Sequence, residues 1–309
     1  MDLLAGLLDG PRARSAFVMR SAFNPPWSLR IEDRAPLTVV AVTRGTAWMM
    51  SDAGSADRLA AGDLVICRGP DGYTMADDPS TPPLAVIHPG QLVLGPDGAP
   101  LCEALGFDVR GWGPAPDGAT GLVTGTYENT GEVCARLLRA LPAVVVLRRG
   151  EVDDRLVELL VAESARDEPG QGAVLDRLLD LLVVAALRAW FARDEAPSWY
   201  HAYGDPMVGT AMRMMQHEPD RPWTVADLAT AVGASRAALA RRFTDLVGAP
   251  PMAFLTEWRL ALAADLLRGT DATLESVARK VGYSSAFALS TAFKRHHGVS
   301  PREYRRAAS

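Results

Sequence analysis

The feature that most constrains this chain is an internal repeat near its C-terminal end. The segment VADLATAVGASRAALARRF, which starts at Val225, aligns with LESVARKVGYSSAFALSTAF, which starts at Leu274. Both copies carry an alanine, a turn glycine and a closing phenylalanine: Ala229 and Ala278, Gly233 and Gly282, Phe243 and Phe293. A glycine suits the left-handed residue that ends a helix, and a serine hydroxyl can cap the helix that follows. Each copy therefore predicts two helices joined by a tight turn, which is a helix-turn-helix unit.

The second helix of each unit is predicted to begin at a serine and to carry basic residues. These helices are Ser235–Asp245 and Ser284–His297, the latter capped by Ser284 or Ser285. A third helix, Pro251–Leu267, joins the units and spans about 24 Å at 1.5 Å per residue. A helix-turn-helix unit places its second helix in the DNA major groove. Two such helices on one connecting helix predict contacts with neighbouring major-groove faces, about one helical turn apart.

The distribution of charge favours a nucleic-acid partner for this region. The whole chain has a net charge of −5 at pH 7, which by itself disfavours such a partner. Residues 205–309, however, hold 14 Arg and Lys against 10 Asp and Glu, whereas the remainder holds 18 against 27. A basic part on an acidic body is typical of a DNA-binding protein with a separate domain for another task. The alternative is a helical bundle with incidental basic residues.

Two phrases in this region, PWTVADLA and VGYSSAFALSTAFKRHHGVSPREYRR, resemble the DNA-binding domain of the AraC/XylS transcription regulators. The resemblance covers about 100 residues. It implies a sequence-specific regulator with double-stranded DNA as its partner. It also implies an activator, with RNA polymerase as a second partner.

The resemblance assigns DNA-contacting positions on the two second helices. On the first they are Arg236, Ala237, Ala240 and Arg241, with Arg242 as a phosphate contact or a packing residue. On the second they are Ser285, Ala286, Ala288, Ser290 and Thr291, with Lys294 and Arg295 as phosphate contacts. The guanidinium fork of Arg241 matches O6 and N7 of guanine, whereas relatives often place an arginine where this chain has Thr291. Each helix-turn-helix unit is expected to bind one half of the DNA site, and we therefore expect the half-site of the first unit to dominate sequence preference.

Other residues of this region are predicted to be structural. Helical spacing predicts six core side chains: Leu239, Phe243, Leu260, Ala278, Leu289 and Phe293. Four residues are expected in tight loops after the second helices: Gly248, Gly298, Pro301 and Tyr304. A lead helix is predicted at Met207–His217, with its methionines in the core.

The region from Ala16 to about Val146 has the pattern of a β-sheet domain. Short apolar runs such as Leu37–Met50 and Asp63–Gly69 are separated by Gly, Pro and Asp turns, which predicts a sandwich or barrel. The stretch Leu59–Pro79 resembles a cupin turn, and with the preceding residues it resembles the cupin-type sensor domain of one AraC branch. The predicted fold class is thus multidomain α and β. It combines an N-terminal cupin-like β-barrel with flanking helices and a C-terminal all-α domain with two helix-turn-helix motifs.

Metal and catalytic chemistry is not expected in the barrel. Metal cupins hold their ion with clustered histidines and a carboxylate. Here Tyr73 stands where a histidine is common, and His88 is the only histidine of the barrel region. The sequence supplies no nucleophile–base pair either, so a catalytic barrel is the weakest of the functional alternatives. We expect no metal, no cofactor and no enzymatic activity.

Helices are predicted on either side of the barrel. The pair Asp153–Asp167 and Ala173–Arg193 is amphipathic. These two helices either pack on the barrel or form a homodimer seam, and the resemblance favours dimerisation. Residues 1–14 are expected to form a short helix and then a loop at Gly10-Pro11. Another short helix is expected from Gly131 to before Pro142, and a linker at Asp194–Pro206. The predicted domains are a sensor (residues 1–150), a helical dimerisation and linker segment (residues 151–203) and the DNA-binding domain (residues 204–309).

The signal that switches the protein is the least defined feature of the sequence. An unknown small-molecule effector is expected in a pocket of aromatic and cationic side chains: Trp27, Arg30, Trp48, Tyr73 and Trp112. Core packing explains each of these residues equally well. One alternative is oxidation of Cys67, Cys102 or Cys134, which requires an exposed, electropositive thiol. Another is a barrel that senses a partner protein while the contact with DNA is constitutive.

The sequence also indicates where the protein acts. Its most apolar stretch, Val174–Ala192, contains four charged residues and does not predict a membrane span. The N-terminus has no evident signal peptide, and three cysteines do not make a disulfide framework. A reducing cytoplasm is therefore expected.

Overall fold

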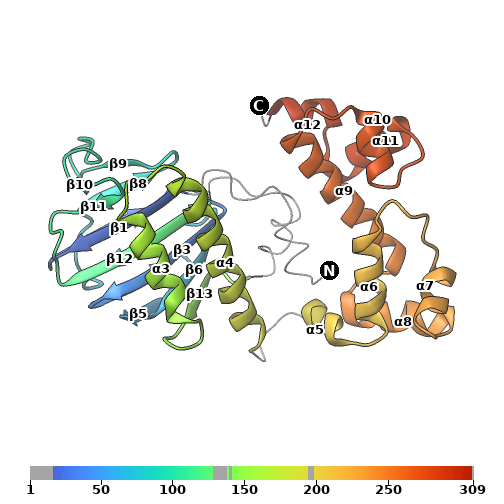
Figure 1. Cartoon of the computed structure of the whole chain (residues 1–309), viewed down its shortest axis with the longest axis horizontal. Coiled ribbons are helices and arrows are strands. Elements are labelled where there is room, and N and C mark those ends of the chain that lie inside the picture. The colour runs from blue at the N-terminus through green and yellow to red at the C-terminus, as the bar shows by residue number, and fades with distance from the viewer. Residues whose placement is uncertain (1–16, 128–137, 139–140, 194–197, 308–309) are drawn as a thin grey trace. The chain divides into compact units, whose positions relative to one another are not determined.

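The computed structural model describes residues 17–127, 138, 141–193 and 198–307. Contacts divide these residues into two compact units (Figure 1), one of residues 17–193 and one of residues 198–307. The helix predicted at residues 1–14, and most of the one predicted at residues 131–142, lie outside the described residues.

The N-terminal unit consists of two β-sheets. Among the described residues, the first sheet has seven strands in the order β10-β11-β1-β12-β3-β6-β13, and the second has six in the order β5-β4-β7-β2-β8-β9. The strands of the first sheet are β1 (Phe17–Phe23), β3 (Leu37–Arg44), β6 (Leu64–Arg68), β10 (Gly106–Asp108), β11 (Gly111–Trp112), β12 (Thr120–Tyr127) and β13 (Val144–Leu147). Those of the second are β2 (Ser28–Ile31), β4 (Thr46–Ser51), β5 (Ala56–Ala60), β7 (Tyr73–Ala76), β8 (Ala85–His88) and β9 (Leu92–Leu94). Neighbouring strands are antiparallel except for β1 with β11 and β2 with β8, which are parallel.

The two sheets share one core. Val40 of β3 and Leu122 of β12 are buried in the same cluster as Met49 of β4 and Met75 of β7. These four residues come from both sheets, so the inner faces of the sheets pack against each other. The predicted β-rich N-terminal unit is confirmed, and its two packed sheets are compatible with the cupin-like barrel that was expected.

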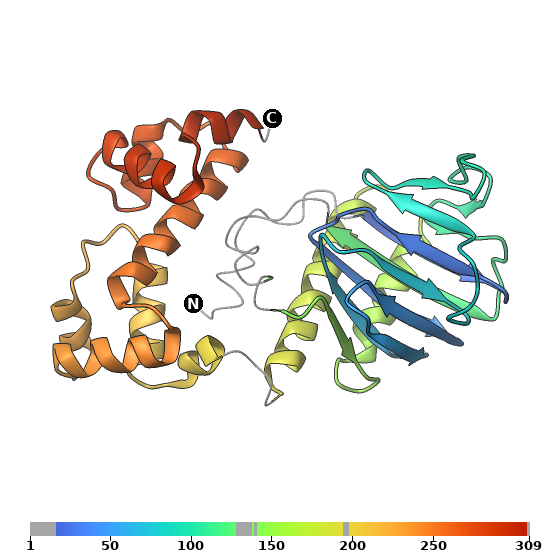
Figure 2. The same cartoon turned by 180° about the vertical axis from the view of Figure 1, so that it is seen from behind.

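The outer face of the first sheet is covered by the helices α3 (Asp154–Ser164) and α4 (Gln171–Phe191), which pack side by side (Figure 1). Seen from the opposite side, the same helices lie behind the strands (Figure 2). The Tyr127 hydroxyl donates a hydrogen bond to Asp180 at 3.1 Å. A Cβ at Gly125 would lie 2.3 Å from the Leu179 side chain, so this glycine allows α4 to approach β12 closely. The central strands are therefore buried on both faces.

The N-terminal predictions differ from the structure mainly in their boundaries. The predicted strand Leu37–Met50 is divided into β3 and β4 at Gly45, which has a φ of +72°. A Cβ at Gly45 would lie 2.3 Å from the Ala119 carbonyl oxygen, so only glycine fits this turn. The predicted helix Asp153–Asp167 corresponds to α3, and the Asp153 side chain caps it by accepting a hydrogen bond from the Arg155 amide.

The C-terminal unit is entirely helical. Its helices are α5 (Ser198–Gly204), α6 (Val208–His217), α7 (Val225–Ala231), α8 (Arg236–Val247), α9 (Pro251–Gly269), α10 (Leu274–Lys280), α11 (Ala286–His297) and α12 (Pro301–Ala307). The pairs α7–α8 and α10–α11 are the two predicted helix-turn-helix units. The long helix α9 connects them and contributes to the hydrophobic core of each. The predicted all-α domain with two such motifs is confirmed.

The turn chemistry of the repeat matches the prediction. Gly233 and Gly282 have φ angles of +68° and +78°, in the left-handed region. Ser235 accepts a hydrogen bond from the Ala238 amide at 3.2 Å. In the second unit Ser285, rather than Ser284, caps the helix through the Ala288 amide. The six predicted core residues are all at most 2% exposed.

Two short helices were not predicted. The predicted linker Asp194–Pro206 contains α5, whose Ala202 is fully buried in the core with α6 and α8, so the prediction of a linker is wrong for residues 198–204. Pro301 and Tyr304 belong to α12 and not to a loop. Glu303 accepts hydrogen bonds from the Ser300 amide and hydroxyl, and proline suits the first helical position, so this segment starts a helix.

The two turn glycines provide a matched test of the packing. We expect Gly233→Ala to cost about 1–2 kcal/mol, the ordinary cost of a left-handed alanine, because no atom lies within 4 Å of the new Cβ. We expect Gly282→Ala to cost about 1–3 kcal/mol more, because its Cβ would meet the Pro219 carbonyl oxygen at 2.7 Å. Amide hydrogen exchange of the flanking helices in the full chain measures both costs. Equal costs would contradict the close approach at Gly282.

Candidate nucleic-acid interface and ligand cavity

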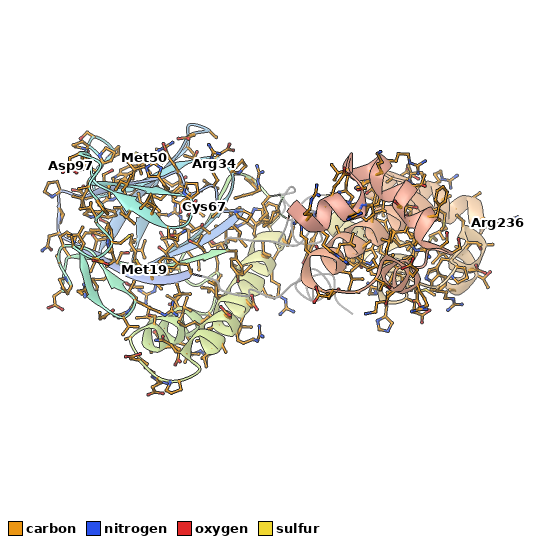
Figure 3. All side chains as sticks on the ribbon, turned by 90° about the horizontal axis from the view of Figure 1, so that it is seen from above. Met19, Arg34, Met50, Cys67, Asp97 and Arg236 are labelled. Atoms are coloured by element: carbon orange, nitrogen blue, oxygen red, sulfur yellow. The ribbon has the colours of Figure 1, made fainter. Side chains whose placement is uncertain are left out.

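The exposed face of α8 carries the residues predicted to contact DNA. Arg236, Ala237 and Arg241 are exposed, and Ala240 is half-buried. Leu239, about 160° round the helix from Ala237 and from Arg241, is in the core. Figure 3 shows Arg236 at the surface of the C-terminal unit. Within the described part of the chain, the guanidinium groups of Arg236 and Arg241 have no ion-pair or hydrogen-bond partner, so both are available to a ligand.

The neighbouring residue Arg242 has a different environment. Its guanidinium donates to the buried carboxylate of Asp205, with Nε 2.7 Å and Nη2 2.5 Å from Oδ2. Asp205 also accepts hydrogen bonds from the amides of Met207 and Val208, at the start of α6. The hydrogen bonds from Arg242 and from these amides hold the pKa of Asp205 below its ordinary value. This pairing links α8 to α6, which favours a structural role for Arg242 over a phosphate contact.

The corresponding face of α11 is less charged in its first turns. Ser285 and Thr291 are exposed, whereas Ala286, Ala288 and Ser290 are half-buried. The Thr291 hydroxyl donates to the Phe287 carbonyl oxygen at 3.0 Å. The last turn of the helix carries the exposed basic side chains Lys294 and Arg295. The positive charge of α11 is therefore concentrated at its C-terminal end.

One exposed residue of α11 was not among the predicted contacts. The side chain of Phe287 is 81% exposed. Helical periodicity was the signal that marked it, because Phe287 lies on the opposite side of α11 from the buried residues Leu289 and Phe293.

The N-terminal unit contains a cavity of about 250 Å³ between its two sheets. Its wall is mainly aliphatic and aromatic and is formed by strands of both sheets: Phe17, Met19, Leu29, Ile31, Val40, Tyr73, Met75, Ile87, Val93, Trp112 and Leu122. Figure 3 labels Met19 in this unit. Polar groups are few, which is typical of a site for a small molecule.

One end of the cavity is polar and reaches the surface. Asp33 and Gln91 are half-buried there, and Cys102 is exposed. The Asp33 carboxylate accepts a hydrogen bond from the Ala35 amide at 3.0 Å, and Gln91 Nε2 lies 3.4 Å from its second oxygen. Tyr73 also lines the cavity, and burial raises the pKa of its phenol well above the ordinary value. A bound molecule therefore meets a carboxylate at one end of a mainly apolar cavity.

Of the five predicted pocket residues, only two line this cavity. Tyr73 and Trp112 line the cavity, whereas Trp27, Arg30 and Trp48 do not. Trp27 is buried in the core and stacks on Phe23. The guanidinium of Arg30 is held by Asp52 at 2.6 Å and by Glu32 at 3.0 Å. Arg30 points away from the cavity because its neighbours in β2, Leu29 and Ile31, point into it.

The cysteines predicted as redox candidates have unequal environments. Cys67 is buried, and burial raises the pKa of its thiol far above the ordinary value, so this side chain lacks the exposed, electropositive setting that reactivity requires. Cys102 is exposed and free at the mouth of the cavity. Cys134 lies outside the described residues.

Two further observations concern the described residues alone. No group of three or more His, Cys, Asp and Glu side chains among them is placed to hold a metal ion. None of their helices combines the length and apolar character needed to cross a membrane.

The chain has two helix-turn-helix units on a shared helix, and it also has a β-sheet unit with an internal cavity. Together these features define a DNA-binding protein with a separate domain. Comparison with known proteins gives the same division. Residues 2–192 match the family model described as a cupin, and residues 228–307 match the one described as a helix-turn-helix domain.

The curated relatives include proteins that cover nearly the whole chain and others that cover about half of it. A Streptomyces lividans protein named as an AraC-like transcription regulator is 30% identical over 99% of this chain and 98% of its own length. The HTH-type transcriptional regulator AlkR of Acinetobacter baylyi is 35% identical over 55% of this chain and 58% of its own. Among solved structures, a Chromobacterium violaceum regulator with an AraC-type DNA-binding domain is 30% identical, over 35% of this chain and 96% of that one, with a TM-score of 0.33. The chain belongs to the AraC family: it is a DNA-binding transcription regulator with a cupin N-terminal domain.

Proposed function

We propose that this protein is a dimeric activator that binds a specific DNA sequence and is switched by a small molecule in its cupin domain. The observation that carries the DNA-binding part is the pair of exposed faces on α8 and α11, held on opposite ends of α9. In this proposal Arg241 contacts guanine in the first half-site. Lys294 and Arg295 contact phosphates of the second, and RNA polymerase is the partner in activation. Membership of a family of transcription regulators supports an action by binding rather than by catalysis, and a DNA target supports a cytoplasmic location.

Dimerisation is supported by the outward face of α3 and α4, in the segment of residues 151–203. Val174 and Leu181 of α4 are 45% and 50% exposed and are seven residues apart, so they lie on one side of the helix. Leu159 of the adjacent α3 is 53% exposed. Exposed apolar side chains on these two adjacent helices favour burial against a partner, and we propose a second copy of this chain.

The effector is proposed to occupy the cavity of the N-terminal unit. A volume of about 250 Å³ with a mainly apolar wall favours a compact, largely apolar molecule. The carboxylate of Asp33 at the mouth favours a molecule that presents a cation or another hydrogen-bond donor at one end. Oxidation of Cys102 at the same mouth is the alternative signal, because a modified thiol there alters access to the cavity.

Neighbouring arginines of α8 test the DNA contact. We expect Arg241→Ala to weaken specific binding by about 1–3 kcal/mol and to relax preference at one base pair, because a bidentate guanine contact is lost. We expect the matched control Arg242→Ala to retain the preference, because Asp205 already engages its guanidinium. Selection of sites from random duplexes, followed by titrations at fixed salt, measures both variants. A larger loss of preference in Thr291→Ala than in Arg241→Ala would contradict the assignment.

The dimer seam is tested by placing a charge on it. We expect Leu181→Glu to convert the dimer to a monomer, because two buried carboxylates would face each other across the seam. The control is Val109→Glu, at a residue 58% exposed and outside α3 and α4, which leaves the dimer intact. Sedimentation velocity over a range of concentrations distinguishes the two states. A monomeric wild type, or a dimeric Leu181→Glu variant, would exclude this seam.

The cavity is tested with a panel of amines and neutral analogues that share an apolar body. We expect a bound amine to stabilise the N-terminal unit by about 2.7 kcal/mol at 100 times its Kd. Asp33→Asn should weaken amine binding at least about tenfold and leave neutral analogues unaffected, because only the amine needs the carboxylate. Asp97→Asn, at an exposed carboxylate that does not line the cavity, is the control. No thermal shift with any member of the panel would contradict an effector of this class.

A further inference from the structure

Phe287 is the most exposed large apolar side chain in the described part of the chain. It is 81% exposed and lies in the first turn of α11. The buried residues Leu289 and Phe293 follow at about 200° and 240° round the helix, at 100° per residue, so Phe287 points away from the core. Removing a phenyl ring from water is energetically favourable, so the exposed position of Phe287 favours contact with a binding partner.

The repeat shows which surface Phe287 faces. Leu239 and Phe243 of α8 correspond to Leu289 and Phe293 of α11, and each pair is fully buried. The residue of α8 that corresponds to Phe287 is therefore Ala237, on the exposed face that also carries Arg241. In a helix-turn-helix unit the N-terminal residues of the second helix contact base edges.

The first turns of α11 around Phe287 carry small uncharged residues and no charged side chain. Thr291, one turn further along, uses its hydroxyl hydrogen in a bond to the Phe287 carbonyl oxygen at 3.0 Å, so it has no hydrogen left to donate to a base. Ala286 and Ala288 precede and follow Phe287 in the sequence. The basic residues Lys294 and Arg295 lie at the other end of α11, where they can hold the phosphate backbone. The base-reading end of α11 thus presents a phenyl ring among small uncharged residues, where α8 presents guanidinium groups.

An apolar surface in the major groove has one matching feature on the bases, the C5-methyl group of thymine. We infer that Phe287 packs against thymine methyl groups and makes the second half-site specific for thymine. This inference rests on the proposed sequence-specific binding of DNA. Without this contact, α11 is expected to contribute mainly affinity for the phosphate backbone. The contact of Phe287 adds a preference for particular bases.

The test replaces thymine by uracil, which removes only the methyl group. The full-length protein first selects its sites from random duplexes, and each thymine of the second half-site is then replaced in turn. We expect the wild type to lose about fourfold in affinity at one or two positions, the value of one buried methyl group. Phe287→Ala should bind the thymine duplex more weakly and lose nothing further with uracil, and Phe287→Leu should fall between the two.

Controls separate this inference from the proposal on which it rests. Val299→Ala removes another exposed apolar side chain, 40% exposed and beyond the C-terminal end of α11, and should keep the full uracil penalty. If a motif is selected but uracil does not weaken wild-type binding, or weakens Phe287→Ala as much as the wild type, the role of Phe287 is overturned. Sequence-specific binding of DNA then still stands. Wild-type affinity in Phe287→Ala also overturns the role of Phe287 and points to a protein partner for the ring. The absence of any selected motif overturns sequence-specific binding and this inference with it.

Discussion

The C-terminal unit depends on the packing of two cores against one helix, α9. Its first half contributes Phe254 and Leu255 to one core, and its second half contributes Leu260 and Leu267 to the other. Neither helix-turn-helix pair is large enough to bury a stable core alone. Arg259, in the middle of α9, donates hydrogen bonds to two carbonyl oxygens of the loop before α7 and so fastens that loop to the helix. The separation of α8 and α11 is therefore a property of a continuous helix and not of a flexible linker, which favours a fixed half-site spacing.

The N-terminal unit meets a different constraint, because its first sheet is buried on both faces. Strand β12 shows the consequence most clearly. Thr124 and Thr126 line the cavity, whereas Gly125 and Tyr127 contact α4. Since successive side chains of a strand point to opposite faces, a molecule in the cavity and the helix α4 contact the two sides of the same strand. The proposed effector site and the proposed dimer seam are thus separated by one layer of β-sheet and by the helix α4, which provides a physical route between them.

Features set by local chemistry could be predicted from the sequence, and features set by distant residues could not. The turn at Gly233 and the cap at Ser235 follow from the conformations available to glycine and serine, so both were predicted correctly. The ion pair of Arg242 with Asp205 joins residues 37 positions apart, and no local pattern indicates it. The helix α5 has only seven residues and depends on the burial of Ala202 against other helices. Composition suggested Arg30 as a pocket residue, but the alternation of β2 turns it away from the cavity.

The two helices proposed to contact bases, α8 and α11, carry different side chains. The interaction energies of these side chains decide which helix contributes more to sequence preference. A bidentate contact from an arginine such as Arg241 discriminates against the wrong base by about 1–3 kcal/mol, because a mismatch leaves hydrogen-bonding groups unpaired. A methyl group packed against Phe287 is worth only about 0.8 kcal/mol, and its loss leaves no polar group unsatisfied. If α8 reads guanine and α11 reads thymine, the first half-site still dominates specificity. The second then tolerates variation and tunes affinity, a division that follows from the side chains on two otherwise equivalent helices.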